Sequence, residues 1–310
     1  MSDATIVEPG SPTGAAARRD AWYAAELGVE ARSFWAETRR RFLANKVGVA
    51  AALVLLVLVV TSFAAPLLSS HDPLVGDATN RLQPVLSDGH LLGTDEQGRD
   101  MLSRLLHGGR LSLTAAFVPT IAATVIGTVI GAWAGFVRGA VGSLLMRVMD
   151  MLYAFPAILL AIAVGASLGP GLANAIVAVT IVFIPPIARV AESSARTVAT
   201  QEYMEAARLS GAGRFTLVRT QLLPNVLNHI IVYASGLVGV AMIIAASLSF
   251  LGLGSQPPTP EWGYMLNSLR GSIYVAAGVA VLPGVLIFVT SVAFNLASDA
   301  LREAMDARLD

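Results

Sequence analysis

Long apolar runs constrain this chain more than any other feature. Several of them reach the roughly 18 residues that a helix needs to cross the hydrocarbon core of a bilayer. Of the 310 residues, 55% are hydrophobic and only 14% are charged, whereas a soluble domain is usually about 25% charged. The sequence therefore predicts an all-α integral membrane protein.

We expect six membrane-spanning helices, which place both termini on one side of the membrane. The first run starts too far into the chain, and is too long, for a cleaved signal peptide, so it is read as a retained anchor. Residues 1–45 form a cytoplasmic tail that contains either an interfacial helix or a plain positively charged flank, and residues 46–310 form the membrane domain. The six expected spans cover about 47–68, 111–137, 144–166, 172–190, 226–251 and 273–297.

The distribution of basic residues predicts the orientation. The chain has 21 lysines and arginines, and cytoplasmic segments of membrane proteins carry an excess of both. With a cytoplasmic N terminus, residues 69–110 form an external loop and residues 191–226 a cytoplasmic loop. The external segments then hold only Arg81, Arg99, Arg104, Arg110 and Arg270.

A stripe of glycines in the second span predicts close helix packing. Gly127, Gly131 and Gly135 are four residues apart, so they share one face on which another helix can approach closely. The alternative is that glycine is simply frequent in membrane helices.

Motifs for catalysis and cofactor binding are missing from the sequence. There is no cysteine, no phosphate-binding loop and no H-E-x-x-H pair, so we expect no enzyme, no cofactor and no metal. The zero net charge gives no reason to expect nucleic acid. Ion-coupled carriers usually need ionisable groups deep in their spans, and these are nearly absent. The four histidines have no ligand spacing: His71, His90, His107 and His229.

The polar stretch EYMEAARLSGAGRFTLVRTQLLPN, residues 202–225, predicts a helical hairpin. Residues 202–209 are good helix formers, Gly211 stands at a C-terminal capping position, and Gly213 adds a second joint. Residues 214–223 form the second helix, which Pro224 stops. The tip is small, with Ala206, Ala207 and Gly211, and it is flanked by Glu205, Arg208 and Arg214. Composition leaves two interpretations open: a docking site for another protein, or an amphipathic hairpin on the lipid surface.

The spacing within this stretch resembles a known motif. Glu205-Ala206-Ala207, then Gly211, then Leu223-Pro224 twelve residues further on, is similar to the EAA motif of ABC importer permeases. Two further segments, LLGTDEQGRDMLSRLLHGGRLSL and SLSFLGLGSQPPTPEWGYML, resemble the C-type permeases of the dipeptide, oligopeptide and nickel branch. The resemblance covers about residues 35–305. Many relatives carry a glutamate where this chain has Ala245.

The resemblance implies a six-helix, type I ABC importer (MetI-like) permease core in the bacterial inner membrane. Its implied partners are a homologous second permease, two ATP-binding cassette subunits and an extracytoplasmic substrate-binding protein, with the lipid bilayer around it. The motif residues would couple ATP hydrolysis by the partners to alternating access in this chain. The implied cargo is di- or oligopeptides. Nickel chelates, glutathione and oligosaccharides are alternatives, as are a stand-alone secondary carrier and a scaffold without transport activity.

The external segments give two local predictions. Thr94 followed by Gln97 fits an N-cap signature, so residues 95–104 are expected to form a charge-rich helix on the outer face. That helix would contact the binding protein or the second permease, or would cap the pathway structurally. Trp262, which follows three prolines, is expected to be an interfacial aromatic residue.

Overall fold

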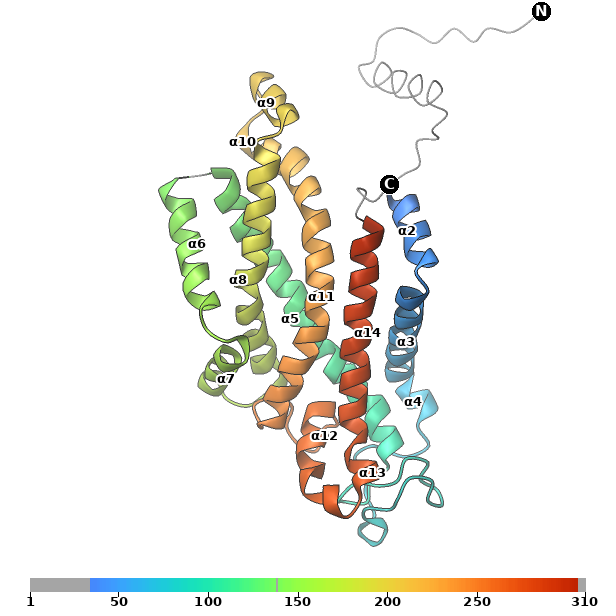
Figure 1. Cartoon of the computed structure of the whole chain (residues 1–310). Helices are drawn as coiled ribbons and strands as arrows, with labels where there is room; N and C mark the ends of the chain where they lie inside the picture. Colours follow the sequence, from blue (N-terminus) through green and yellow to red (C-terminus); the bar gives the residue numbers. More distant parts are fainter. Residues whose placement is uncertain (1–33, 138, 306–310) are drawn as a thin grey trace, which may run out of the picture.

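Figure 1 shows a bundle of helices with a long irregular loop at one end. The computed structural model describes residues 34–137 and 139–305, so residues 1–33 of the predicted tail, which covers residues 1–45, lie outside this part. Within it there are only two isolated β-bridges and no strands. Five helices are long and apolar enough to cross a membrane, or six if one bent pair counts as a single span. The predicted all-α membrane fold is confirmed.

The described chain begins with a short helix that runs into the first span. α2 (Phe34–Ala44) is followed by α3 (Lys46–Phe63), and Asn45 between them caps α3 by accepting from the backbone N–H of Gly48 (2.9 Å). The Asn45 amide also donates to Glu303 near the end of the last helix (3.0 Å). The first span is followed by a short separate helix, α4 (Ala65–Leu68), which has a proline near its N-terminus. Both ends of the described chain are therefore held together.

Two long helices form the centre of the bundle. α5 (Met101–Val137) and α8 (Leu172–Ala199) pack against each other more extensively than any other pair. α5 contains Pro119 in its interior and α8 contains Pro185 and Pro186. At about 1.5 Å per residue, the 37 residues of α5 exceed the thickness of a bilayer core, so part of α5 extends beyond it.

The third expected span is not one straight helix. α6 (Ala140–Tyr153) and α7 (Ala157–Leu168) meet at a bend of 93°. Pro156 stands at the break, where it lacks a backbone donor and disfavours helical geometry in the residue before it. The single span predicted over residues 144–166 is therefore wrong in shape.

The last two long helices complete the bundle. The fifth span begins early, because α10 (Arg214–Leu217), the π-helical turn η2 (Val218–Leu222) and α11 (Leu223–Phe250) follow one another without a break. The sixth consists of α13 (Ala277–Ala280) and α14 (Leu282–Met305). A Cβ added at Gly239 of α11 would lie 2.8 Å from the carbonyl oxygen of Ser291, so α11 and α14 approach closely.

Between α11 and α13 the chain folds back onto the bundle through α12 (Trp262–Ser268) and η3 (Leu269–Tyr274). Trp262 is 1% exposed, and its indole N–H donates to the carbonyl oxygen of Leu105 (2.8 Å). Glu261 caps α12 and accepts from the hydroxyl of Ser112 in α5 (2.8 Å). Trp262 is therefore a core anchor, and its predicted interfacial role is wrong, because the side chain packs against α5 in the interior.

The long loop, residues 69–100, contains buried ions rather than the predicted helix over residues 95–104. The Asp95 carboxylate accepts from the backbone N–H groups of Gln97 (2.8 Å) and Arg99 (3.0 Å), which makes a turn, and Gly98 in this turn has a φ of 72°. The N-terminal cap falls on Asp100, which accepts from the N–H of Ser103 (2.8 Å). The helix therefore begins only at α5, since the capping carboxylate lies six residues beyond Thr94.

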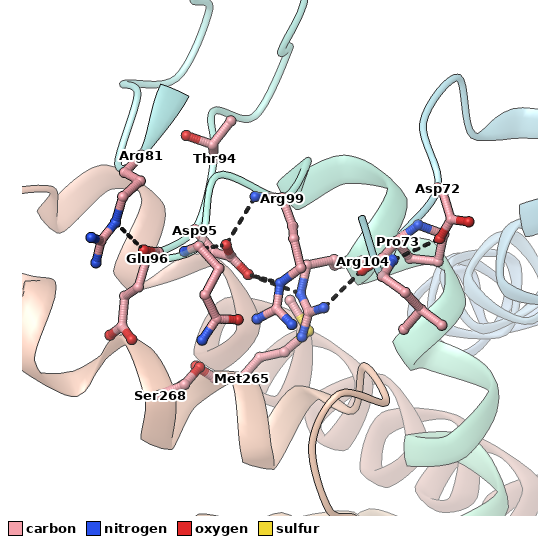
Figure 2. Close-up of polar contacts among 12 residues, drawn as sticks. Asp72, Pro73, Arg81, Thr94, Asp95, Glu96, Arg99, Arg104, Met265 and Ser268 are labelled. Carbon is pink, nitrogen blue, oxygen red and sulfur yellow. Dashed lines mark hydrogen bonds and ion pairs between the residues drawn. The ribbon is translucent and has the colours of Figure 1, made fainter. Parts of the chain in front are cut away.

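Figure 2 shows how the ions of this loop are arranged. Arg99 Nε lies 2.7 Å and Arg104 Nε 3.2 Å from the same oxygen of Asp95, and all three side chains are buried. Arg104 also donates to the carbonyl oxygen of Pro73 (2.8 Å), and Arg81 donates to that of Glu96. We call Asp95, Arg99 and Arg104 the buried ion cluster; it joins the loop to the first turns of α5.

Candidate functional site: the hairpin before α11

The stretch predicted to dock a partner forms a helical hairpin at the end of the bundle opposite the long loop (Figure 1). α9 (Glu202–Leu209) has the bounds that the sequence predicts, and α10 follows after the turn. We define the hairpin as residues 200–217. Since α8 leads into it and α10 leads directly towards α11, a force on the hairpin acts on two membrane helices.

The turn of the hairpin is a Schellman cap. The backbone N–H of Gly211 donates to the carbonyl oxygen of Arg208 (3.0 Å), and that of Ala212 to the carbonyl oxygen of Ala207 (3.2 Å), which is the bond pattern of this motif. Gly211 has a φ of 82° and open space around its Cα. A side chain there would be disfavoured by backbone conformation alone.

A few inward contacts hold the hairpin in place. Met204 is fully buried and Leu217 is 2% exposed, so each helix of the hairpin has an apolar anchor. The guanidinium of Arg208 stacks over the ring of Phe136 at the end of α5, 5.8 Å from its centroid. One of the predicted flanking charges is therefore engaged within the chain itself.

Apolar side chains stand exposed at the tip. Leu209 is 89% exposed and Phe215 is 77% exposed. Glu205, Ala206 and Arg214 are also exposed, and the side chains of Glu205 and Arg214 make no hydrogen bond or ion pair with the residues that the structure describes. Exposed large apolar groups edged by charges mark surfaces that bind other proteins.

Pro224 does not end the second helix of the hairpin, contrary to the prediction. It stands in the first turn of α11, directly after η2, and Leu223 donates its N–H to the carbonyl oxygen of Val218. This bond joins residues five apart in the sequence, so the turn is π-helical and holds one residue more than an α-helical turn. The helix therefore continues past Pro224, which has no backbone N–H to donate. Leu223 is half-buried and Pro224 is exposed.

The three glycines of α5 all face α8. A Cβ at Gly127 would lie 2.9 Å from the carbonyl oxygen of Ile184, and one at Gly135 would lie 2.6 Å from that of Glu192. A Cβ at Gly131 would collide with the carbonyl oxygen of Ala188. The backbone of α8 therefore lies directly against the glycine positions of α5, at three points over residues 127–135.

Ion pairs surround the same end of α8. Arg196 contacts Glu192 (2.5 Å), whose side chain is 6% exposed. Arg189 pairs with Asp150 of α6. The Arg189–Asp150 pair therefore ties α6 to α8, whereas the Arg196–Glu192 pair lies within α8.

Other contacts of this site carry no local sequence signal. The burial of Met204 and the stacking of Phe136 depend on how α9 folds against α5, and nothing in residues 202–225 indicates either.

Comparisons with known proteins define the class of this protein. Residues 127–310 match the family described as binding-protein-dependent transport system inner membrane component, and residues 33–84 match the N-terminal TM domain of oligopeptide transport permease C. The chain belongs to this family of ABC importer permeases, and it is a multi-pass inner-membrane protein. The predicted membership in the dipeptide, oligopeptide and nickel branch is confirmed.

Two relatives of the chain share one name and most of its length. The chain is 44% identical to a glutathione transport system permease protein of Pectobacterium atrosepticum, covering 90% of this chain and 92% of the relative. It is 41% identical to the protein of the same name from Escherichia coli, with the same coverage. These relatives are transport permeases, which agrees with a non-catalytic membrane subunit.

Solved structures support the fold. The structure of the MetNI methionine ABC transporter, in inward-facing conformations, matches with a TM-score of 0.54 and 22% identity, covering 66% of this chain and 97% of that chain. A second crystal form of the same transporter gives the same score with 23% identity. The predicted MetI-like core is confirmed.

Proposed function

We propose that this permease forms half of a translocation pathway for short peptides of the size of glutathione, and that the hairpin transmits ATP-driven motion into it. Di- and oligopeptides stand first in the sequence-based expectation. The name that the relatives share moves glutathione, itself a small peptide, to the first place. The exposed apolar tip of the hairpin is the observation that carries the coupling role.

The hairpin suits the transmission of force. Its exposed face offers Leu209 and Phe215 as apolar contacts, with Glu205 and Arg214 beside them to set the register. An ATP-binding subunit is a partner of the right kind for such a surface. Its motion would pass through α8 to α5, because the glycine stripe brings the backbone of α8 directly against α5 and tight packing transmits strain.

The orientation follows from charge. The end of the bundle that carries the hairpin also carries α2 with Arg39, Arg40 and Arg41 (Figure 1). Since basic residues concentrate on the cytoplasmic side, we place the hairpin and both termini in the cytoplasm. The long loop then faces the substrate-binding protein.

An open groove supports the half-pathway. It has a volume of about 690 Å³ and runs along α11 and α14. Its wall is mostly apolar, with Ser247, Ser291 and Asn295 as polar points. A second, homologous permease would close this groove, and alternating access would then follow from rigid-body motion of the two permeases, each driven by one of two ATP-binding subunits.

The coupling role is tested with matched glycine variants. In Gly211→Val a β-branched side chain is forced into left-handed backbone, which costs about 1–2 kcal/mol, and the cap is lost. Gly213→Val is the control, because Gly213 has a φ of −65° and open space around it. We expect Gly211→Val and Glu205→Lys to lose ATP-binding subunits in pull-downs and to lose uptake, while Gly213→Val retains both. Retention of both properties by all three variants would refute the coupling role.

The cargo is tested separately. Proteoliposomes that contain the complete transporter are supplied with its binding protein and with labelled glutathione, a dipeptide or a nickel chelate. We expect glutathione uptake that depends on ATP and is reduced by excess peptide. Uptake of the nickel chelate alone would contradict the peptide cargo and leave the coupling role unaffected.

A further inference from the structure

Three side chains of the long loop meet where α5 begins. His71, His90 and Asp100 are distant in sequence, yet their potential ligand atoms lie within 4.8 Å of one another. The two imidazole rings are tilted, with centroids 4.8 Å apart. No other group of three such side chains lies this close within residues 34–137 and 139–305.

The separations match those of metal ligands. His90 Nδ1 lies 2.9 Å from Asp100 Oδ1, and His71 Nδ1 lies 3.9 Å from the same oxygen. Ligand atoms about 2.0–2.2 Å from a tetrahedral zinc ion are about 3.3 Å apart, so the two observed separations bracket the required one. The side chain of His71 is 41% exposed, whereas that of Asp100 is 3% exposed.

Two of the three groups are already fixed. Asp100 is 3% exposed, and one of its oxygens accepts from the N–H of Ser103 (2.8 Å), which leaves the other oxygen facing both imidazoles. The backbone N–H of His90 donates to Ser87 (3.0 Å), and its carbonyl oxygen accepts from the N–H of Gly93 (2.9 Å). His71 is the adjustable member, and its Nδ1 also lies 3.0 Å from the hydroxyl of Ser70.

The Asp100 carboxylate would bind the ion in its deprotonated form, as metal ligands of this type do.

We propose that His71, His90 and Asp100 bind a divalent transition-metal ion of the zinc type. Two imidazoles and one carboxylate suit zinc and its neighbours, whereas magnesium and calcium prefer oxygen ligands alone. Three protein ligands leave one coordination position for water or for a partner's side chain. The ion would tie residues 71 and 90 to the start of α5, and would fix the surface that the long loop presents. This inference does not depend on the identity of the cargo.

The alternative is that His90 and Asp100 form only a hydrogen bond that closes the loop. The two interpretations differ in the role of His71, which a simple hydrogen bond does not require. A metal site also predicts saturable binding of one ion, whereas a hydrogen bond predicts none.

Zinc titration of the full-length chain in nanodiscs distinguishes them. The protein is purified without a histidine tag and stripped with a chelator, and zinc binding is measured by competition with a chromophoric chelator. We expect one saturable equivalent for the unmodified chain. Loss of an outer-shell partner of a metal ligand lowers metal affinity about 10- to 100-fold, and in His71→Ala and Asp100→Asn the zinc affinity should fall by at least this factor. Asparagine at position 100 can still accept the hydrogen bond that caps α5.

His107→Ala is the matched control. His107 is half-buried in α5 with its Nδ1 2.9 Å from the Ser103 carbonyl oxygen, outside the group, and its loss should leave zinc binding unchanged. Hydrogen exchange supplies a second measurement: zinc should slow exchange of residues 69–92 in the unmodified chain and not in His71→Ala. Equal zinc affinity of the unmodified chain and a His71→Ala/His90→Ala double variant, or no saturable binding by the unmodified chain, would overturn the proposal.

Discussion

The hairpin and the long loop are both polar segments between apolar helices, yet they use their side chains in different ways. In the hairpin, Leu209 and Phe215 stand in the open and Met204 is the buried anchor of α9. In the long loop, Asp95 is 3% exposed and Arg104 is 1% exposed. Both segments expose apolar side chains, such as Leu86 (77%) in the long loop, but only the long loop buries charged groups such as Asp95 and Arg99.

This difference separates two roles. An exposed apolar tip adds little to the stability of the isolated chain, so the coupling role proposed for it concerns the binding of a partner. Buried charges are costly unless they are paired, so the buried ion cluster is explained by the structure of the chain itself. Substitutions at the two ends should therefore affect different measurements.

The largest expected effect is on the buried ion cluster. Asp95→Ala removes the carboxylate that faces Arg99 and Arg104 and leaves two buried cations without it. Breaking a buried pair in this way costs about 3–5 kcal/mol. Unfolding in SDS would measure the loss. Asp88→Ala, at an exposed carboxylate of the same loop, is the control and should change little; equal effects of the two substitutions would remove the contrast between the two ends.

The glycine stripe should give the next effect. Gly131→Ala places a methyl group against the carbonyl oxygen of Ala188 and 2.7 Å from the Cβ of Ala191, and such overpacking costs about 1–3 kcal/mol. A Cβ at Gly271 would meet nothing within 4 Å, so Gly271→Ala serves as the control in the same unfolding assay. If the two variants are equally stable, α5 and α8 separate more easily than their contact suggests.

A smaller effect is expected where the hairpin contacts α5. Arg208→Gln removes the cation over Phe136, a contact worth about 0.5–1 kcal/mol at an exposed site. A double-mutant cycle with Phe136→Leu isolates this coupling. Arg219→Gln, at an exposed arginine beyond the turn, should show no coupling to Phe136.

The smallest effect on stability is expected at the tip. Leu209→Ser with Phe215→Ser changes only exposed side chains, so the free energy of unfolding should move by no more than about 0.5 kcal/mol. Association with the ATP-binding subunit should nevertheless fall at least about tenfold, which corresponds to 1.4 kcal/mol. Leu217→Ser, at a buried anchor, should instead destabilise the chain itself. A tip variant that binds the ATP-binding subunit normally would contradict the docking role.

Sequence was most informative where the structure depends on nearby residues. The bounds of α9 and the position of Gly211 were predictable, because a helix cap and a left-handed residue leave local signals. The apolar spans were predictable for a similar reason, since length and composition decide them. Even there, Pro156 indicates only that the third span can bend, and the size of the bend, 93°, was not predictable, because prolines are also tolerated in straight spans.

Contacts between distant segments were not predictable. Residues 95–104 carry a capping signature, but Asp95 turns back onto its own loop and binds two arginines. Trp262 resembles an interfacial residue until its N–H meets Leu105 of α5. The histidines look scattered in the sequence, and only the fold brings His71 and His90 together. A single sequence does not encode such pairings in its local pattern.

The π-helical turn η2 has a consequence for how the hairpin is aimed. An α-helix turns by about 100° per residue, and a π-turn holds one residue more than the helix requires. Deleting one residue from 218–222 would restore a regular helix and swing the tip by about that angle around the axis of α11, with every tip side chain retained. The direction in which this chain points its tip is therefore adjustable by a single codon, independently of the residues that the tip presents.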